Sequence, residues 1–258
     1  MSIGTQIEWT DATWNPMSGC SKISSGCDRC YAERIAERFR GTPGHPFEHG
    51  FDLTLRSHKV GEPLSWRTPR RVFVNSMSDL FHKEVPRSFI DSVFDTMERA
   101  NWHVFQILTK RSSLLRNYLN QRYANGQAPA HIWLGVSIEA RDYLVRLAHL
   151  KQARASVRFV SFEPLLEDLG ALDLGGIHWA IVGGESGPGA RPIDADWVRG
   201  LRDQCRAQAV AFFFKQWGGV RPKSGGNRLD GRQWLQYPVK ARSTARASEK
   251  PTNSPAMV

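Results

Sequence analysis

Short apolar runs of strand length alternate with segments of helical periodicity along most of the chain. The runs are rich in Val, Ile, Phe and Trp, and they end in polar residues or glycine. The predicted strands cover residues 13–17, 71–75, 103–109, 132–137, 157–162, 177–182 and 210–215. Apolar residues recur at helical spacing after most of them, which predicts helices around 31–39, 89–97, 114–119, 143–147 and 197–201.

This alternation is typical of parallel βαβ units. The sequence therefore predicts an α/β fold, a full or partial (β/α) TIM-like barrel of six to seven parallel strands. We expect residues 1–238 to form a single barrel-like domain. Residues 239–258 contain Ser, Ala and Pro without periodicity and carry four basic residues against Glu249, so they are predicted to be a disordered basic tail.

Three of the four cysteines lie in one loop, residues 19–33, after the first predicted strand. Cys20, Cys27 and Cys30 have the spacing Cys-x6-Cys-x2-Cys, and three thiols cannot all pair with one another as disulfides. They can hold three irons of a [4Fe–4S] cluster and leave the fourth iron open to another ligand.

A zinc site is the alternative for the same loop. Structural zinc takes four ligands, and the candidates for the fourth are His45, His49 and Cys205. Cys205 lies on a predicted helix, where a lone cysteine usually packs in the core.

Composition and charge limit the function classes. The formal net charge of +10 permits a polyanionic partner such as nucleic acid. Tryptophans such as Trp66 could stack on bases, although packing is the commoner role. No apolar run is long enough to span a bilayer, and the few clustered cysteines favour a reducing cytoplasm. The chain has no P-loop, GxSxG, HExxH or dinucleotide-binding fingerprint.

Polar residues collect where the predicted strands end. In a (β/α) barrel these ends meet at one mouth, where catalytic residues gather. The charged residues at these positions are Asp79, Lys110, Glu139, Glu163, Glu185 and Lys215. The run from Gly183 to Gly189 would let the backbone approach a ligand closely. A metal-free barrel hydrolase that uses these carboxylates is a further alternative.

Several motifs together resemble a known family. They are Ile7–Asp11, Trp14–Pro16, Gly19-Cys20, Gly26–Glu33, Asn75–Phe81, Leu108–Arg111, Gly183–Gly187, Phe214–Gly218, Leu229–Arg232 and Trp234. This set resembles a phage-associated family of unknown function with a three-cysteine motif, which is similar to a divergent branch of the radical S-adenosylmethionine enzymes. That superfamily usually has Cys-x3-Cys-x2-Cys, so the second gap matches and the first is longer here.

The resemblance implies an enzyme that generates a 5′-deoxyadenosyl radical. Cys20, Cys27 and Cys30 would bind the [4Fe–4S] cluster, and S-adenosylmethionine would chelate its open iron. An electron donor such as flavodoxin or ferredoxin is implied, and the substrate is unknown. By their strand-end positions, Asn75, Ser76 and Asp79 would contact the cofactor, and Glu163, Glu185 and Lys215 would face the substrate.

Nucleic acid or nucleotide modification in a phage setting fits the charge and the family's distribution. The competing function is a zinc-stabilised nucleic-acid-binding protein without catalysis.

Overall fold

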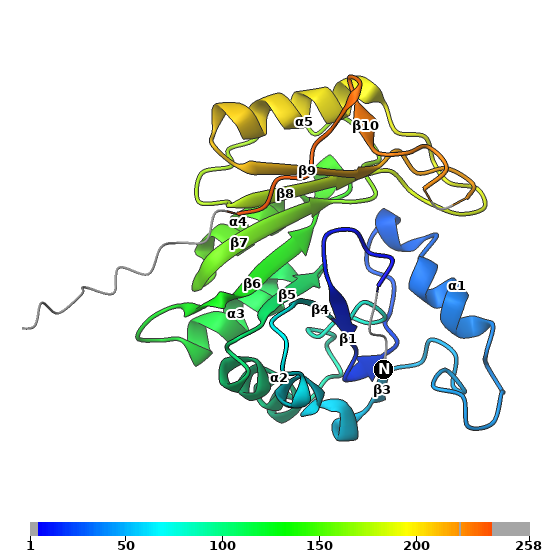
Figure 1. Cartoon of the computed structure of the whole chain (residues 1–258), viewed down its shortest axis with the longest axis vertical. Coiled ribbons are helices and arrows are strands. Elements are labelled where there is room, and N and C mark those ends of the chain that lie inside the picture. The colour runs from blue at the N-terminus through cyan, green and yellow to red at the C-terminus, as the bar shows by residue number, and fades with distance from the viewer. Residues whose placement is uncertain (1–4, 222, 239–258) are drawn as a thin grey trace, which may run out of the picture.

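The computed structural model describes residues 5–221 and 223–238. Its main sheet has seven strands in the order β1-β4-β5-β6-β7-β8-β9, and all neighbouring strands are parallel. The sheet curls into a half-barrel (Figure 1), so the prediction of a partial TIM-like barrel is confirmed. The strands are β1 (Ala12–Trp14), β4 (Arg71–Val74), β5 (Val104–Thr109), β6 (Ala128–Ser137), β7 (Ala155–Phe162), β8 (Trp179–Gly183) and β9 (Ala211–Gln216).

Four helices pack against the outer face of the half-barrel, and a fifth lies beside its mouth (Figure 1). The outer helices are α2 (Arg87–Arg99), α3 (Ser112–Arg122), α4 (Val145–Gln152) and α5 (Ala195–Ala207), and the fifth is α1 (Tyr31–Glu37). Two small antiparallel pairs join β2 (Met17–Ser18) to β3 (Thr54–Leu55) and β10 (Arg228–Leu229) to β11 (Arg232–Gln233). Short 3₁₀ turns occupy Ser25–Cys27, Ser57–Lys59, Glu62–Ser65 and Arg141–Tyr143.

The two faces of the sheet have different roles. Successive strand residues point to opposite faces, and in β4 Val72 and Val74 join the outer core while Phe73 belongs to a second, inner cluster. The inner cluster is aromatic: the ring centroid of Trp9 lies 4.6 Å from that of Phe73 and 6.0 Å from that of Trp179. These rings fill the half-barrel toward the amino ends of its strands.

The inner face becomes polar toward the carboxyl ends. Residues two positions apart share a face, so Phe73 is followed by Asn75, Phe159 by Ser161, and Phe213 by Lys215. The sheet thus closes one end with aromatic packing and presents polar side chains at the other. This polarity places the candidate chemistry at the carboxyl-end mouth.

The structure corrects two local predictions. The strand predicted over residues 13–17 is divided between β1 and β2, because Pro16 has no N–H group to continue a ladder. The helix predicted over residues 31–39 ends at Glu37 and packs through buried Ala32 and Ala36. Tyr31, Ile35 and Phe39, the large members of the predicted apolar face, are exposed.

Two further predictions concern the chain ends and the membrane. The predicted disordered basic tail, residues 239–258, lies outside the described residues. Among the residues that are described, no helix has the length and apolar character needed to cross a membrane.

Candidate metal centre and cofactor cavity

The cysteine loop, residues 19–33, lies across the carboxyl ends of the strands. At the end of β4, the Gly19 N–H donates to the Met77 carbonyl at 3.0 Å, and the Tyr31 hydroxyl donates to the Ser76 carbonyl at 2.6 Å. Beyond β6, the Ser24 hydroxyl donates to Glu139. The loop is therefore fastened to two separate strand ends and faces the mouth.

Glu185 fastens the same loop to the end of β8. Its carboxylate accepts two hydrogen bonds from the Arg191 guanidinium, at 2.6 and 3.0 Å, and one from Arg29 at 3.4 Å. Arg191 also donates to the Ser25 carbonyl at 2.8 Å. Burial raises the pKa of Glu185, but the hydrogen bonds and positive charge of Arg191 outweigh it, so the net pKa is lowered. Glu185, a predicted catalytic residue, acts here as an ionised anchor.

Arg111 connects the loop to a buried carboxylate. Its guanidinium donates to Asp79 at 3.1 Å, to the Cys20 sulfur at 3.3 Å and to the Ser21 carbonyl at 3.1 Å. The side chains of Arg111 and Asp79 are only 8% and 9% exposed. Asp79 also accepts from the Thr109 hydroxyl at 2.7 Å. Asp79 thus positions Arg111, which in turn positions the first cysteine.

The same pair sets the electrostatics of Cys20. Burial raises the pKa of its thiol, the negative charge of Asp79 raises it further, and Arg111 opposes both. A cationic metal centre would favour the thiolate, because a coordinating thiol is deprotonated. His82 completes this corner of the site, with its Nε2 2.8 Å from the Ser21 hydroxyl.

All three loop cysteines line one cavity of about 320 Å³ at the mouth. Cys20, Cys27 and Cys30 are half-buried free thiols. The predicted cofactor residues Asn75, Ser76 and Asp79 line the same cavity. The structure therefore brings together two residue groups that lie about 50 positions apart in the sequence.

Asn75 is a buried polar side chain in this cavity that lacks a partner within the described residues. It is 3% exposed, and neither its amide oxygen nor its amide nitrogen has a hydrogen-bond partner within the described residues. Its φ of 62° is left-handed, a conformation that asparagine tolerates better than most residues. A buried polar atom without a partner costs about 1–3 kcal/mol, and a ligand that pairs with it removes that cost.

Glu163 and Lys215 form an ion pair between the ends of β7 and β9. Their side chains are 19% and 23% exposed. Neither residue is part of the cavity lining.

The alternative metal ligands lie in other surroundings. Cys205 is fully buried in the outer core on α5, where burial raises the pKa of its thiol to about 12, and the prediction that it packs in the core is confirmed. His45 stacks on Phe39 at 3.9 Å between ring centroids, and its Nδ1 accepts from the Phe47 N–H. Residues 5–221 and 223–238 contain no group of three or more His, Cys, Asp or Glu side chains gathered closely enough to hold one metal ion.

Comparison with protein families assigns the chain to a group. A family described as "Protein of unknown function (DUF5131)" matches residues 4–238. The chain belongs to this family. The family that the sequence motifs resemble is likewise one of unknown function. A search of curated proteins finds no match.

Two solved structures share a distant likeness. A spore photoproduct lyase mutant with bound AdoMet and dinucleoside spore photoproduct is 12% identical, with a TM-score of 0.41 over 77% of this chain and 62% of that one. Spore photoproduct lyase complexed with dinucleoside spore photoproduct is 11% identical, with a TM-score of 0.39 over 75% and 60%. The chain thus spans less than two thirds of the length of these proteins. A likeness this distant carries no functional argument.

Gly26 provides a test of how the cysteine loop is seated. A Cβ at this position would lie 2.6 Å from the Glu139 carboxylate, which is fully buried and paired with Arg146 at 2.8 Å. We expect Gly26→Ala to displace the loop and to lower the melting temperature by several degrees. Gly200→Ala is the matched control, because a Cβ on this α5 residue meets open space. It should stabilise the protein by about 0.5–1 kcal/mol. Equal melting temperatures for the two variants would contradict the seating.

Proposed function

We propose that the protein is an iron–sulfur enzyme of the radical S-adenosylmethionine type. In this proposal Cys20, Cys27 and Cys30 hold a [4Fe–4S] cluster, and S-adenosylmethionine binds in the adjoining cavity. One observation carries it: three free thiols share a cavity with a buried, unpartnered amide at the carboxyl-end mouth of a half-barrel. Active sites of barrel folds lie at this end.

The donor set fits this cofactor. Iron–sulfur clusters are held by cysteine thiolates, and three of them leave one iron for a further ligand. The two carboxylates of the loop are paired with cations, Glu33 with Lys22 at 2.9 Å and Asp28 with Arg191 at 3.6 Å. The thiols are therefore the groups that the loop leaves available to a metal centre.

Bound together, the cluster and S-adenosylmethionine would supply reductive cleavage of the sulfonium, which would give methionine and a radical that abstracts hydrogen. The one electron needed would come from a donor such as flavodoxin or ferredoxin. The chain's own residues provide binding and charge. Arg111 places a positive guanidinium 3.3 Å from the Cys20 sulfur. Hydrogen bonds to the sulfurs of a cluster, and charge near them, influence the reduction potential of that cluster.

The residues predicted to contact the cofactor divide into two roles. Asn75 offers a free donor and a free acceptor, which match the carboxylate and ammonium of an amino acid group such as that of S-adenosylmethionine. Asp79 is occupied by Arg111 and Thr109, so it supports the site from behind. Ser76 lines the cavity, and its hydroxyl is hydrogen-bonded to Asn15 at 3.1 Å.

On the substrate side we retain Glu163 and Lys215, whose ion pair joins the ends of β7 and β9 outside the cavity lining. A substrate could replace either partner of this ion pair, with a cationic or donor group binding the Glu163 carboxylate or an anionic or acceptor group binding the Lys215 ammonium. A nucleic acid or nucleotide substrate is supported by the net charge of +10. Glu185 is removed from the catalytic group, because Arg29 and Arg191 hold it in the loop anchor.

The experiment uses anaerobically reconstituted full-length protein with dithionite and S-adenosylmethionine. We expect release of 5′-deoxyadenosine, measured by mass spectrometry. Asn75→Gly removes the amide while keeping the positive φ, and should weaken S-adenosylmethionine binding by about 5- to 150-fold. Asn117→Gly on α3 is an exposed control for the loss of an asparagine side chain. A reconstituted protein that neither binds nor cleaves the cofactor would contradict the proposal.

A further inference from the structure

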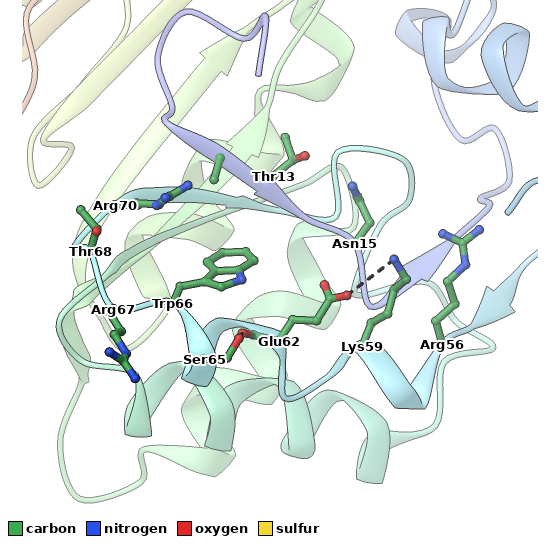
Figure 2. A pocket seen from close by; sticks show the side chains of 11 residues that line it. Thr13, Asn15, Arg56, Lys59, Glu62, Ser65, Trp66, Arg67, Thr68 and Arg70 are labelled. Atoms are coloured by element: carbon green, nitrogen blue, oxygen red, sulfur yellow. Dashed lines mark hydrogen bonds and ion pairs between the residues drawn. The ribbon is translucent and has the colours of Figure 1, made fainter. Parts of the chain in front are cut away.

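A second cavity, of about 400 Å³, lies beside the edge strand β1 (Figure 2). We call it the β1-edge pocket. One wall comes from β1 and the residue after it, including Thr13 and Asn15, and the other comes from the segment Arg56–Arg70, whose two 3₁₀ turns fold back against β1. The side chains that carry its chemistry are Arg56, Lys59, Glu62, Trp66, Arg67 and Arg70.

The pocket has an excess of positive charge. Four cations face one carboxylate, Glu62, and that carboxylate lies 3.7 Å from Lys59. In the described part of the chain, no carboxylate lies within 4.0 Å of the guanidinium of Arg56, Arg67 or Arg70. Arg56 donates instead to the Ser18 hydroxyl at 2.9 Å. A net charge of three positive groups in one cavity favours an anion with more than one charge.

An aromatic ring separates the cations into two groups. Figure 2 shows Arg67 and Arg70 on one side of the Trp66 indole, and Glu62, Lys59 and Arg56 on the other, with Glu62 paired to Lys59. Trp66 is half-buried, and its ring packs edge-on against His103 at 5.8 Å. A rigid ring flanked by guanidinium groups suits a planar base between phosphates, since bases stack on aromatic faces and cations neutralise the backbone.

We propose that the β1-edge pocket binds a segment of single-stranded nucleic acid. A base stacks on Trp66, and the phosphates on its two sides contact Arg67 and Arg70 at one end and Arg56 and Lys59 at the other. The pocket lies at the edge of the main sheet, because β1 has a neighbouring strand on one side only. The proposal does not depend on what the cysteine loop holds.

The pocket adjoins the mouth of the half-barrel. Asn15 lines the pocket, and its amide donates at 3.1 Å to the Ser76 hydroxyl, which belongs to a residue of the cysteine cavity. Arg56 holds Ser18, which precedes Gly19 and Cys20. A strand held in the β1-edge pocket therefore passes next to the proposed catalytic cavity.

The test measures binding of a fluorescein-labelled ten-nucleotide oligothymidylate to the full-length protein by anisotropy, over a range of salt concentrations. Arg67→Ala/Arg70→Ala should weaken binding by about 25-fold at 0.1 M salt and reduce the slope of log K against log salt by about 1.4. The matched control is Arg154→Ala/Arg206→Ala, which removes the same charge from exposed positions elsewhere. It should change the slope by much less.

The aromatic part of the proposal has its own arm. Trp66→Ala should weaken binding by about 5- to 150-fold, and Trp66→Phe should retain most of it, because a phenyl ring still stacks. Circular dichroism checks that each variant folds. If Arg67→Ala/Arg70→Ala does not fold, Arg67→Gln, which changes an exposed side chain, replaces it. Equal losses in the pocket and control variants would overturn the proposal. So would competition by thymidine monophosphate at the same concentration as the oligonucleotide, which would indicate a mononucleotide site.

Discussion

Cys27→Ala is expected to abolish cluster binding. The wild-type protein, reconstituted with iron and sulfide under anaerobic conditions, should hold about four irons per chain and absorb broadly in the visible region, as expected for a Cys-ligated [4Fe–4S] centre. With Cys27 removed, only Cys20 and Cys30 remain beside the cavity. The proposed cluster already has one iron without a protein ligand, and two thiolates are too few to hold it. Iron and labile sulfide should therefore fall to near zero.

Cys205→Ala is the matched control for this experiment. Its thiol is fully buried in the outer core and does not line the cysteine cavity. The substitution should lower stability through lost packing and leave the iron content unchanged. An unchanged cluster in Cys27→Ala, or equal losses in both variants, would show that the loop is not the site of the metal.

Arg111→Met is expected to destabilise the protein by about 3–5 kcal/mol. The substitution leaves the buried carboxylate of Asp79 without its cation, and an uncompensated buried charge has a cost of this size. It also removes the donors that hold Cys20 and Ser21. Urea unfolding measures the first effect, and iron content after reconstitution measures the second.

The double variant Arg111→Met/Asp79→Asn, in which the amide oxygen can still accept from the Thr109 hydroxyl, separates these effects. It removes both charges, so it should recover most of the lost free energy of unfolding. Iron binding should remain impaired, because Cys20 still lacks its anchor. A double variant as unstable as Arg111→Met would mean that the buried ion pair is not the cause of the destabilisation.

The sequence predicts the sheet well because its strands are buried on both faces and read as continuous apolar runs. The positions of Asn75, Ser76 and Asp79 follow directly, since each lies beyond the same strand end. The burial of Cys205 was also foreseeable from its place in a helical pattern. These features depend on local periodicity together with one general rule about barrel mouths.

The side-chain partners could not be predicted in the same way. Arg111 meets Cys20 across 91 positions, and Glu185 meets Arg29 across 156. Both arginines lay in motifs that the sequence had already marked, but only the fold shows which carboxylate each one meets. That Asn75 lacks a partner depends on packing around the cavity and leaves no trace in the local pattern.

Helix α1 shows a different failure of the pattern. Tyr31, Ile35 and Phe39 have helical spacing, yet the helix packs through Ala32 and Ala36. The small residues let the helix backbone approach the mouth, and the Tyr31 hydroxyl is held by Ser76. Periodicity identified the helix, but its orientation was set by the anchoring of the loop before it.

The most direct test of the proposed cluster site is electron paramagnetic resonance on the reconstituted, dithionite-reduced wild-type protein, recorded with and without S-adenosylmethionine. We predict the signal of a reduced [4Fe–4S] cluster and a change in its g values when the cofactor is added, because the cofactor occupies the open iron. One zinc per chain with no iron signal would contradict the account, as would a cluster signal that S-adenosylmethionine leaves unchanged.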